Sequence, residues 1–389
     1  MARDTSRGQA ALTRVYRSIF CRMRWLNALA ERGLRPASQH RKKRTRCDRS
    51  SKKDPHKHSF RNPKPRLAAF GLRQMESLEQ RTMLAADLSY GSSTEPTIEF
   101  TLSFNTGTNE YQLADSSSPE TILSTASKAA ALDGGIQISA PTSASILTLD
   151  VASLANAGET AVITLIGHDE TEDTVRIQAD TDFSVLGSVL TVGETEFTLK
   201  GFERLKLHGG ASANTFTLED IDFNGISIDG GGSLDTIASE NDGNEWIIGL
   251  EDAPADAGIL NNSTDFTSVE NIIGGIGADG FEFTEGASIT GTIDGGGGED
   301  GLDYAAYATA ISVDLSSGLA TGMAGFSNIT NVTGSAAAND ELHGPAADVE
   351  WRFTGLNEGV AYLDFFGDQL AFFGIEQFFG ADDFADSYV

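Results

Sequence analysis

Short runs in which apolar and polar residues alternate follow one another between residues 88 and 200. Such runs occupy residues 97–104, 144–151, 160–166, 174–177 and 195–200. Alternation over about four to eight residues predicts a strand with one buried face. Residues 121–132 instead predict a short helix. We therefore expect residues 88–200 to form a β-rich N-terminal part of the body.

An internal repeat begins at residue 201 and continues to the end of the chain. One element reads Phe-x-x-(Leu/Val/Ile)-x-x-apolar-x-Gly and starts, with small changes of spacing, at Phe202, Phe266, Phe326 and Phe372 or Phe373. A second element, Ile-Asp-Gly-Gly-Gly, occurs at residues 228–232 and 293–297. Tryptophan segments begin at Trp246 and Trp351, 105 residues apart (351 − 246). Internal repetition on this scale is typical of solenoid proteins.

The spacing of the glycine turns indicates the kind of solenoid. Gly209 and Gly230 lie 21 residues apart (230 − 209), and so do Gly274 and Gly295 (295 − 274). A coil of about 20 residues, with two or three short strands and turns of Gly, Asp and Asn, is typical of a parallel β-helix. We therefore predict an all-β fold, a parallel β-helix (β-solenoid), in which residues 201–389 form the Gly/Asp-rich repeats.

The apolar positions of the repeats predict the core, because each coil must stack its inward side chains on those of the next. The predicted core positions are Phe281, Phe283, Ile289, Ile293, Leu302, Ile311, Val313, Leu315, Ile329 and Val332. The last turn, at residues 380–386, stops without a polar capping coil, which indicates a shortened relative of longer repeat proteins.

Charge divides the chain near residue 82. Up to that point it carries 22 of its 28 Lys and Arg and 6 of its 56 Asp and Glu, so the net charge changes from +16 to −44 beyond it. Residues 41–57 are so rich in Lys and Arg that they cannot bury enough apolar surface to offset the entropy of folding. We therefore predict that residues 1–87 are a mostly disordered basic leader. Both cysteines, Cys21 and Cys47, lie in it.

A short motif marks the end of this leader. Residues 75–87 read Met-Glu-Ser-Leu-Glu-Gln-Arg-Thr-Met-Leu-Ala-Ala-Asp. This segment resembles the LEPR-XLL motif, an N-terminal signature of large exported proteins of planctomycete bacteria. The matching positions are Leu78, Glu79, Arg81 and Leu84, whereas Gln80 replaces a Pro and Met83 replaces a Leu. The resemblance implies export, processing of the leader and a secreted or cell-surface protein. The alternative is a chance amphipathic turn.

Two glycine turns carry candidate chemistry. Residues 274–282 and 295–303 fit Gly-Gly-x-Gly-x-Asp-x-apolar-x, which resembles the haemolysin-type (RTX) Ca²⁺ repeat. The resemblance implies that Asp279 and Asp300 are Ca²⁺ ligands, with Asp235 in a third copy that has lost one Gly. The wider pattern also resembles filamentous-haemagglutinin-type repeats of bacterial surface proteins. The alternative is that Gly and Asp form tight solvated turns here.

Candidate catalytic residues are few in the acidic body. His168, His208 and His343 show no metal-ligand spacing, and no nucleophile elbow or phosphate-binding loop is present. The sequence therefore indicates a protein that is not an enzyme. The runner-up is a β-helical carbohydrate-active enzyme resembling polysaccharide lyases, for which Lys200, Arg204 and Lys206 are the only cationic cluster. Alternation places Arg204 and Lys206 on one face of a strand.

Taken together, these features predict an exported, non-enzymatic β-solenoid with a structural or adhesive role. The acidic body repels nucleic acid and anionic lipid and attracts cations, so Ca²⁺ is its candidate cofactor. Cell-surface or extracellular matrix components are the expected partners. A leader that binds nucleic acid is the rival for residues 1–87. No stretch reaches the roughly 20 apolar residues that span a bilayer, so we expect no transmembrane segment.

Overall fold

The computed structural model describes residues 86–88, 97–139, 146–151, 154–157, 161–167, 172–240, 243–249, 255–363, 369–380 and 386–389. Contacts divide the chain into two units, residues 1–76 and 77–389, and all the described residues belong to the second unit. The predicted leader and its motif at residues 75–87 therefore lie outside the described residues, apart from Ala86 and Asp87.

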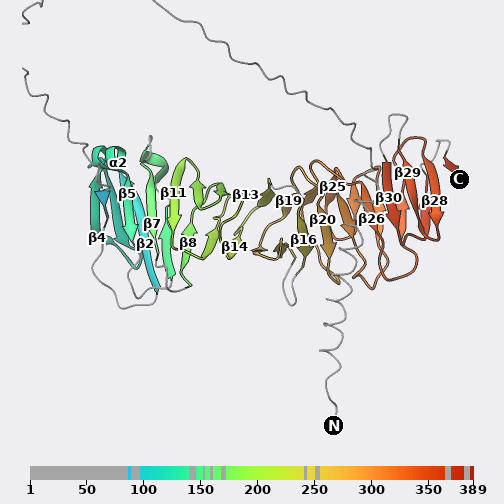
Figure 1. The fold of residues 1–389 in the computed structure, drawn as a ribbon, viewed down its shortest axis with the longest axis horizontal. Coiled ribbons are helices and arrows are strands. Elements are labelled where there is room, and N and C mark those ends of the chain that lie inside the picture. The colour runs from blue at the N-terminus through green and yellow to red at the C-terminus, as the bar shows by residue number, and fades with distance from the viewer. Residues whose placement is uncertain are drawn as a thin grey trace, which may run out of the picture. The chain divides into compact units, whose positions relative to one another are not determined.

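A two-stranded coil of 21 residues is the unit of the stack. Strand β12 (Arg204–His208) pairs in parallel with β14 (Gly225–Asp229), each residue with the one 21 positions later. Strand β13 (Thr215–Glu219) pairs in the same way with β15 (Thr236–Ser239). The first pair belongs to one sheet and the second to another, so each coil contributes one strand to each sheet. The predicted parallel β-helix is confirmed, and Figure 1 shows its strands following one another along the stack.

The first sheet runs in the order β1 (Ala86–Asp87), β5 (Ile136–Ser139), β7 (Ile163–Ile166), β11 (Thr195–Lys200), β10 (Val189–Val192), β9 (Phe183–Leu186), β13, β15, β19 (Asn271–Ile273), β21 (Thr292–Asp294) and β25 (Gly325–Ser327). A smaller sheet has the order β24 (Leu319–Ala320), β23 (Ser312–Asp314), β27 (Glu341–His343) and β31 (Gln377–Phe379). It continues the first sheet, because the N–H of Phe326 donates to the carbonyl of Gly318 (2.7 Å), next to β24.

The second sheet is an open path of paired strands. Its order is β4 (Ser118–Ser127), β3 (Glu110–Asp115), β2 (Thr97–Asn105), β6 (Ile146–Asp150), β8 (Thr174–Gln178), β12, β14, β18 (Thr264–Thr267), β17 (Gly258–Leu260), β16 (Glu245–Ile248), β20 (Gly280–Phe283), β22 (Gly301–Asp303), β26 (Asn331–Thr333), β30 (Gln369–Phe373), β29 (Glu358–Tyr362), β28 (Glu350–Gly355) and β32 (Ser387–Tyr388).

Antiparallel insertions of three strands interrupt the parallel coils. In β16–β17–β18, the first strand pairs forward with β20 and the third pairs back with β14. The strands β28–β29–β30 repeat this arrangement, with β32 ahead and β26 behind. Trp246 and Trp351 are the second residues of β16 and β28, and both are 0% exposed. The 105-residue repeat therefore marks two equivalent insertions, which the sequence pattern did not predict.

The strand pairing continues across the division predicted at residue 201. Strand β8 pairs with β12, and β9 pairs with β13, so coils on either side of that position share both sheets. An insertion of the same kind, β9–β10–β11, lies in the first sheet just before it. The β-rich part beginning at residue 88 and the Gly/Asp-rich repeats thus form one ladder of strands.

The helix predicted over residues 121–132 is misplaced. Most of that stretch belongs to β4, which pairs with β3 in an antiparallel ladder and contains Thr and Ile, residues that favour strands. The helix α2 occupies Lys128–Gly134, and the side chain of Ser127 accepts the N–H of Ala130 (3.3 Å) as its N-cap. The local cap decides where the helix begins. A single turn of 3₁₀-helix, η1, occupies Leu154–Ala157.

The core lies between the sheets, and the predicted positions are in it. Eight of the ten predicted residues are buried, and Leu315 and Ile329 are partly buried against the same cluster. Aromatic side chains stack from coil to coil: the rings of Phe183 and Phe216 lie 4.9 Å apart in paired strands. Such stacking stabilises the register between coils.

Candidate functional site

The three aspartates predicted as Ca²⁺ ligands lie at equivalent turns inside the stack. Asp235 and Asp300 are 0% exposed and Asp279 is 2% exposed. Each follows a glycine-rich turn and directly precedes the next strand. The three residues therefore belong to one structural feature, which we call the aspartate ladder.

One carboxylate oxygen of each ladder residue bonds to the preceding coil. The backbone N–H of Asn214 donates to Oδ1 of Asp235 (2.7 Å), and that of Asp279 donates to Oδ1 of Asp300 (2.8 Å). Asn244 donates to Oδ1 of Asp279 through its backbone N–H (2.5 Å) and its Nδ2 (2.8 Å). Each carboxylate thus satisfies a buried backbone donor that would otherwise lose a hydrogen bond.

The other oxygen, Oδ2, packs against a glycine five residues earlier. A Cβ atom added to Gly274 would lie 2.7 Å from Oδ2 of Asp279, and one added to Gly295 would lie 2.8 Å from Oδ2 of Asp300. Among the described residues, the Oδ2 atoms of all three ladder aspartates are buried without a hydrogen-bond partner. The Gly-Gly-x-x-x-Asp pattern therefore exists because the aspartate occupies the space of a side chain at the glycine.

Burial changes the acidity of these carboxyl groups. Desolvation raises the pKa of Asp279 to about 6, against hydrogen bonds from Asn244 that favour the charged form and with a smaller contribution from the charge of Asp300. Desolvation also raises the pKa of Asp235 and of Asp300 above the usual range. A raised pKa means that the charged carboxylates are held in the stack at a cost in stability.

Asp340 is a fourth member that the nonapeptide pattern did not identify. It is 0% exposed, its Oδ1 accepts the N–H of Ile311 (2.9 Å), and its Oδ2 accepts the N–H of Ser335 (2.6 Å). Its glycine, Gly334, lies six residues earlier instead of five, which hides the match. The signal in the sequence was Gly334 followed by Asp340-x-apolar, with Leu342 as the apolar residue.

Hydrogen bonds within the stack account for Oδ1 of Asp235, Asp279 and Asp300 without a cation. Ca²⁺ takes about six to eight oxygen ligands. Asp235, Asp279 and Asp300 each offer one oxygen that has no hydrogen bond among the described residues, and both oxygens of Asp340 are hydrogen-bonded. Within the described ranges, no three His, Cys, Asp or Glu side chains are grouped as metal ligands. Ca²⁺ at Asp235, Asp279 and Asp300 stays a prediction.

A second candidate site lies on the outer face of the second sheet. Along β12 the leucines Leu205 and Leu207 point into the core, so Arg204, Lys206 and His208 point outward. Lys206 pairs in register with Arg176 of β8. Lys200, in contrast, belongs to β11 in the first sheet. The cationic cluster expected from the sequence is therefore divided between two sheets, and Arg176 replaces Lys200 in it.

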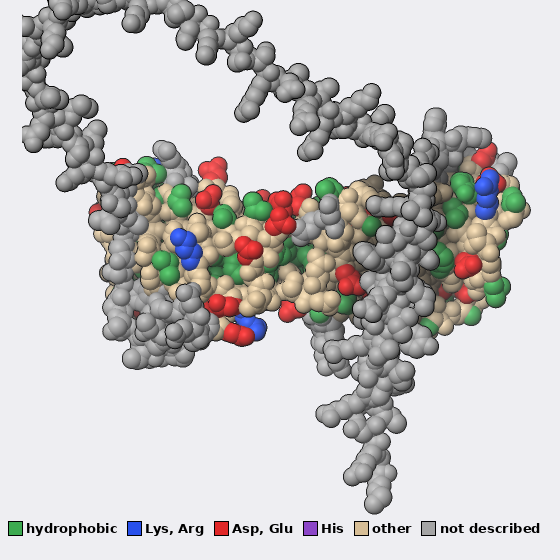
Figure 2. Space-filling view, viewed as in Figure 1, with side chains coloured by type: hydrophobic (Ala, Val, Ile, Leu, Met, Phe, Trp, Pro, Cys, Tyr) green, Lys and Arg blue, Asp and Glu red, His purple; other side chains and the backbone are tan. Residues whose placement is uncertain are grey.

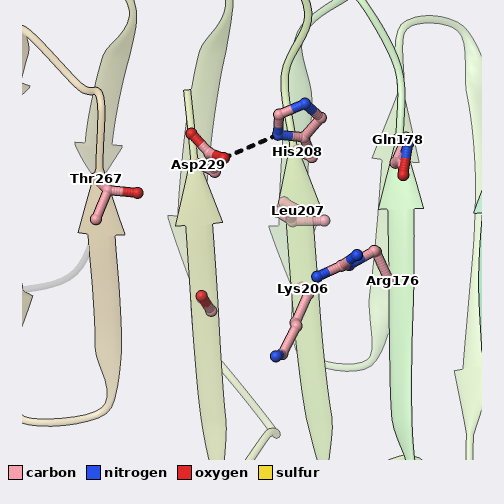
Figure 3. A pocket seen from close by; sticks show the side chains of 8 residues that line it. Arg176, Gln178, Lys206, Leu207, His208, Asp229 and Thr267 are labelled. Atoms are coloured by element: carbon pink, nitrogen blue, oxygen red, sulfur yellow. Dashed lines mark hydrogen bonds and ion pairs between the residues drawn. The ribbon is translucent and has the colours of Figure 1, made fainter. Parts of the chain in front are cut away.

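Arg176, Lys206 and His208 line a pocket of about 350 Å³ over strands β8, β12, β14 and β18 (Figure 3). Its lining residues are Arg176, Gln178, Lys206, Leu207, His208, Ser227, Asp229 and Thr267. We call it the β8–β18 pocket. His208 and Asp229 face each other across paired strands, with 3.1 Å between Nδ1 and Oδ2. The pocket thus combines two cations with an imidazole–carboxylate pair.

The cations differ in their contacts. The guanidinium of Arg204 forms an ion pair with Glu172 (3.0 Å) in which both side chains are more than half exposed. Neither Arg176 nor Lys206 has an ion pair or hydrogen bond from its head group to another described residue. Figure 2 shows how scarce basic side chains are among the acidic ones on the face in view. Two unpaired cations in adjacent strands are therefore unusual for this surface.

The other histidines stand apart from this pocket. The ring of His343 stacks on Phe379 with centroids 4.5 Å apart, and its Nε2 lies 3.2 Å from a carboxylate oxygen of Glu341. His168 lies outside the described residues. The sequence did not single out His208 because its partner Asp229 lies one coil away.

No protein-family model, no curated protein and no solved structure matches the chain. Across the part of the chain that the structure describes, the search for a helix with the length and hydropathy of a membrane span finds none.

Proposed function

We propose that the chain is an exported, non-enzymatic β-solenoid of the cell surface or the extracellular space, with a structural or adhesive role. The observation that carries the proposal is the aspartate ladder, in which equivalent Gly and Asp residues connect coil to coil by the same contacts. A chain that repeats one internal connection from coil to coil is suited to present a regular surface.

The charge of the body and the motif at residues 75–87 support the location. An acidic surface stays soluble and resists association with anionic polymers and lipids except at specific sites. The basic leader and the LEPR-XLL-like segment support export through their resemblance to that motif, and we infer that the leader is removed or engages the membrane during export.

The location is tested in the native host with the full chain carrying a C-terminal epitope. Protease added to intact cells should degrade the epitope, and the exported form should be shorter than the precursor because the leader has been removed. A matched variant with Leu78→Ala and Leu84→Ala should accumulate inside the cell. An epitope that remains protected in intact cells, at full length, contradicts the proposal.

Ca²⁺ is part of the proposal through the ladder aspartates. The buried Oδ2 atoms of Asp235, Asp279 and Asp300 are the oxygens that a cation would have to reach. If Ca²⁺ binds there, it stabilises the folded stack by mass action. The thermal unfolding of the full chain with Ca²⁺ and then with a chelator tests this part separately.

The runner-up function, a carbohydrate-active enzyme, is favoured by one observation. The His208–Asp229 pair lines the same pocket as Arg176 and Lys206, two cations without an ion pair to any described residue. A lyase needs a base and a cation that neutralises a substrate carboxylate, and these residue types supply both. Release of unsaturated sugar from an acidic polysaccharide by the purified chain would favour this function over the non-enzymatic one.

A further inference from the structure

We propose that the β8–β18 pocket binds an acidic polysaccharide whose sugar rings carry carboxylate groups. The proposal rests on the proposed extracellular function, because polymers of that class are encountered outside the cell. The pocket would then be a ligand-binding site and not only a part of the regular scaffold surface.

The first argument is the placement of Arg176 and Lys206. They are register partners in adjacent strands, which lie about 4.8 Å apart in a sheet. Like charges directly opposite each other in neighbouring strands are destabilising. An anion between the two head groups removes that repulsion and forms charge-assisted hydrogen bonds with both. Arg176 also offers a planar fork that matches the geometry of a carboxylate.

The second argument is the polar lining beyond the cations. Gln178, Ser227 and Thr267 offer neutral donors and acceptors, and Asp229, oriented by His208, offers a charged acceptor. A bare anion makes no use of an acceptor carboxylate, whereas sugar hydroxyl groups donate to one. The combination therefore suits a ligand that has both carboxylate and hydroxyl groups.

The third argument is the order of these residues along the stack. One outward row follows Arg176, Lys206, Ser227 and Asp265 through the register of β8, β12, β14 and β18. A linear polymer that lies along this row meets cations at β8 and β12 and an exposed carboxylate at Asp265. Its anionic group is thus positioned over β8 and β12.

The test compares two double variants of the full chain that lose the same charge. Arg176→Gln/Lys206→Gln changes the pocket, whereas Lys200→Gln/Arg352→Gln removes two basic residues elsewhere in the body. The basic leader is present in both, so its own attraction for polyanions cancels in the comparison. Binding of polygalacturonate, dextran sulfate and neutral dextran is measured by titration calorimetry at physiological salt.

We expect the pocket variant to bind polygalacturonate about tenfold more weakly than the control variant, since two charged contacts at the surface are lost. Binding of dextran sulfate should change equally in both variants, and neutral dextran should bind to neither. Equal affinities of the two variants for polygalacturonate would overturn the proposal. A loss in the pocket variant that is as large for dextran sulfate would overturn the assignment to carboxylate sugars.

A single variant, Ser227→Glu, guards against a folding defect of the double variant. It retains both cations and adds a negative charge beside Lys206, so polygalacturonate binding should again weaken while circular dichroism stays unchanged. Unweakened binding by a folded Ser227→Glu variant counts against the proposal. If the binding test fails, the proposed location outside the cell is unaffected. If the protein is found inside the cell, the measured binding is unaffected. The two proposals can therefore fail separately.

Discussion

Replacement of Gly295 by Ala should destabilise the stack far more than the same replacement at Gly280. A Cβ at Gly295 would lie 2.7 Å from Cβ and 2.8 Å from Oδ2 of Asp300, and it would also overlap the carbonyl oxygen of Asn328. The Asn328 atom belongs to the backbone of the next coil, so it cannot rotate away. A Cβ at Gly280 would meet no atom within 4 Å.

The magnitude follows from the contacts that must change. Forcing an extra carbon into a well-packed site costs about 1–3 kcal/mol. If Asp300 moves to make room, the charged hydrogen bond from the N–H of Asp279 weakens, which adds about 1 kcal/mol or more. We therefore expect Gly295→Ala to lower the free energy of unfolding by about 2–4 kcal/mol. Gly280→Ala should be neutral or stabilise by up to about 1 kcal/mol, because Ala restricts the unfolded chain.

The assay is urea unfolding of the full chain, followed by the fluorescence of the buried Trp246 and Trp351. Because long repeat arrays can unfold in parts, hydrogen exchange of the backbone around residues 293–300 gives a local measure beside the midpoint. Protection should fall there in Gly295→Ala alone. Equal midpoints and equal protection in the two variants would refute the contact between Gly295 and Asp300 as the reason for the glycine.

Three further predictions concern acidity, metal and capping. Because the pKa of Asp279 is raised to about 6, the contribution of this carboxyl group to the free energy of unfolding is full below about pH 4 and is lost as pH rises through 6. Asp279→Asn should flatten that part of the stability–pH curve. An unchanged slope would contradict the assignment of this pH dependence to Asp279. If Ca²⁺ binds the ladder, the melting temperature should rise with Ca²⁺ and fall with a chelator. The double variant Asp235→Asn/Asp300→Asn should abolish that shift. A melting curve that neither Ca²⁺ nor the chelator moves excludes Ca²⁺ at the ladder. Ser127→Ala removes the N-cap of α2 and should lower the free energy of unfolding by about 1 kcal/mol, whereas Ser127→Asp should retain it. Equal urea midpoints for the Ala variant and the unmodified chain would argue against the cap.

The sequence was most informative where the repeat is local. Glycine turns 21 residues apart predicted the coil, and alternation predicted inward residues such as Phe281 and Val313, which are buried. It failed at residues 121–127, where strand pairing with β3 overrides a helical pattern. Pairing partners are set by contacts between distant residues, which a short window of sequence does not contain.

The candidate sites show the same division. The pattern drew attention to Asp235, Asp279 and Asp300 but not to what their oxygens contact, since a turn aspartate can face solvent or the coil beneath it. Because of the insertion β9–β10–β11, Lys206 comes 30 positions after Arg176 (206 − 176), so the 21-residue spacing does not reveal that the two residues are register partners.

The sequence by itself determined the β-solenoid class, a coil length of about 20 residues and the inward apolar positions, because period-two alternation and glycine turns act within one coil. Only the tertiary structure decided where antiparallel strands enter the stack and that the ladder carboxylates point inward to backbone N–H groups. Only the tertiary structure decided, too, that Arg176 pairs in register with Lys206 and lines the same pocket as His208 and Asp229. These features depend on which coil lies next to which, and that is a property of the stacked chain.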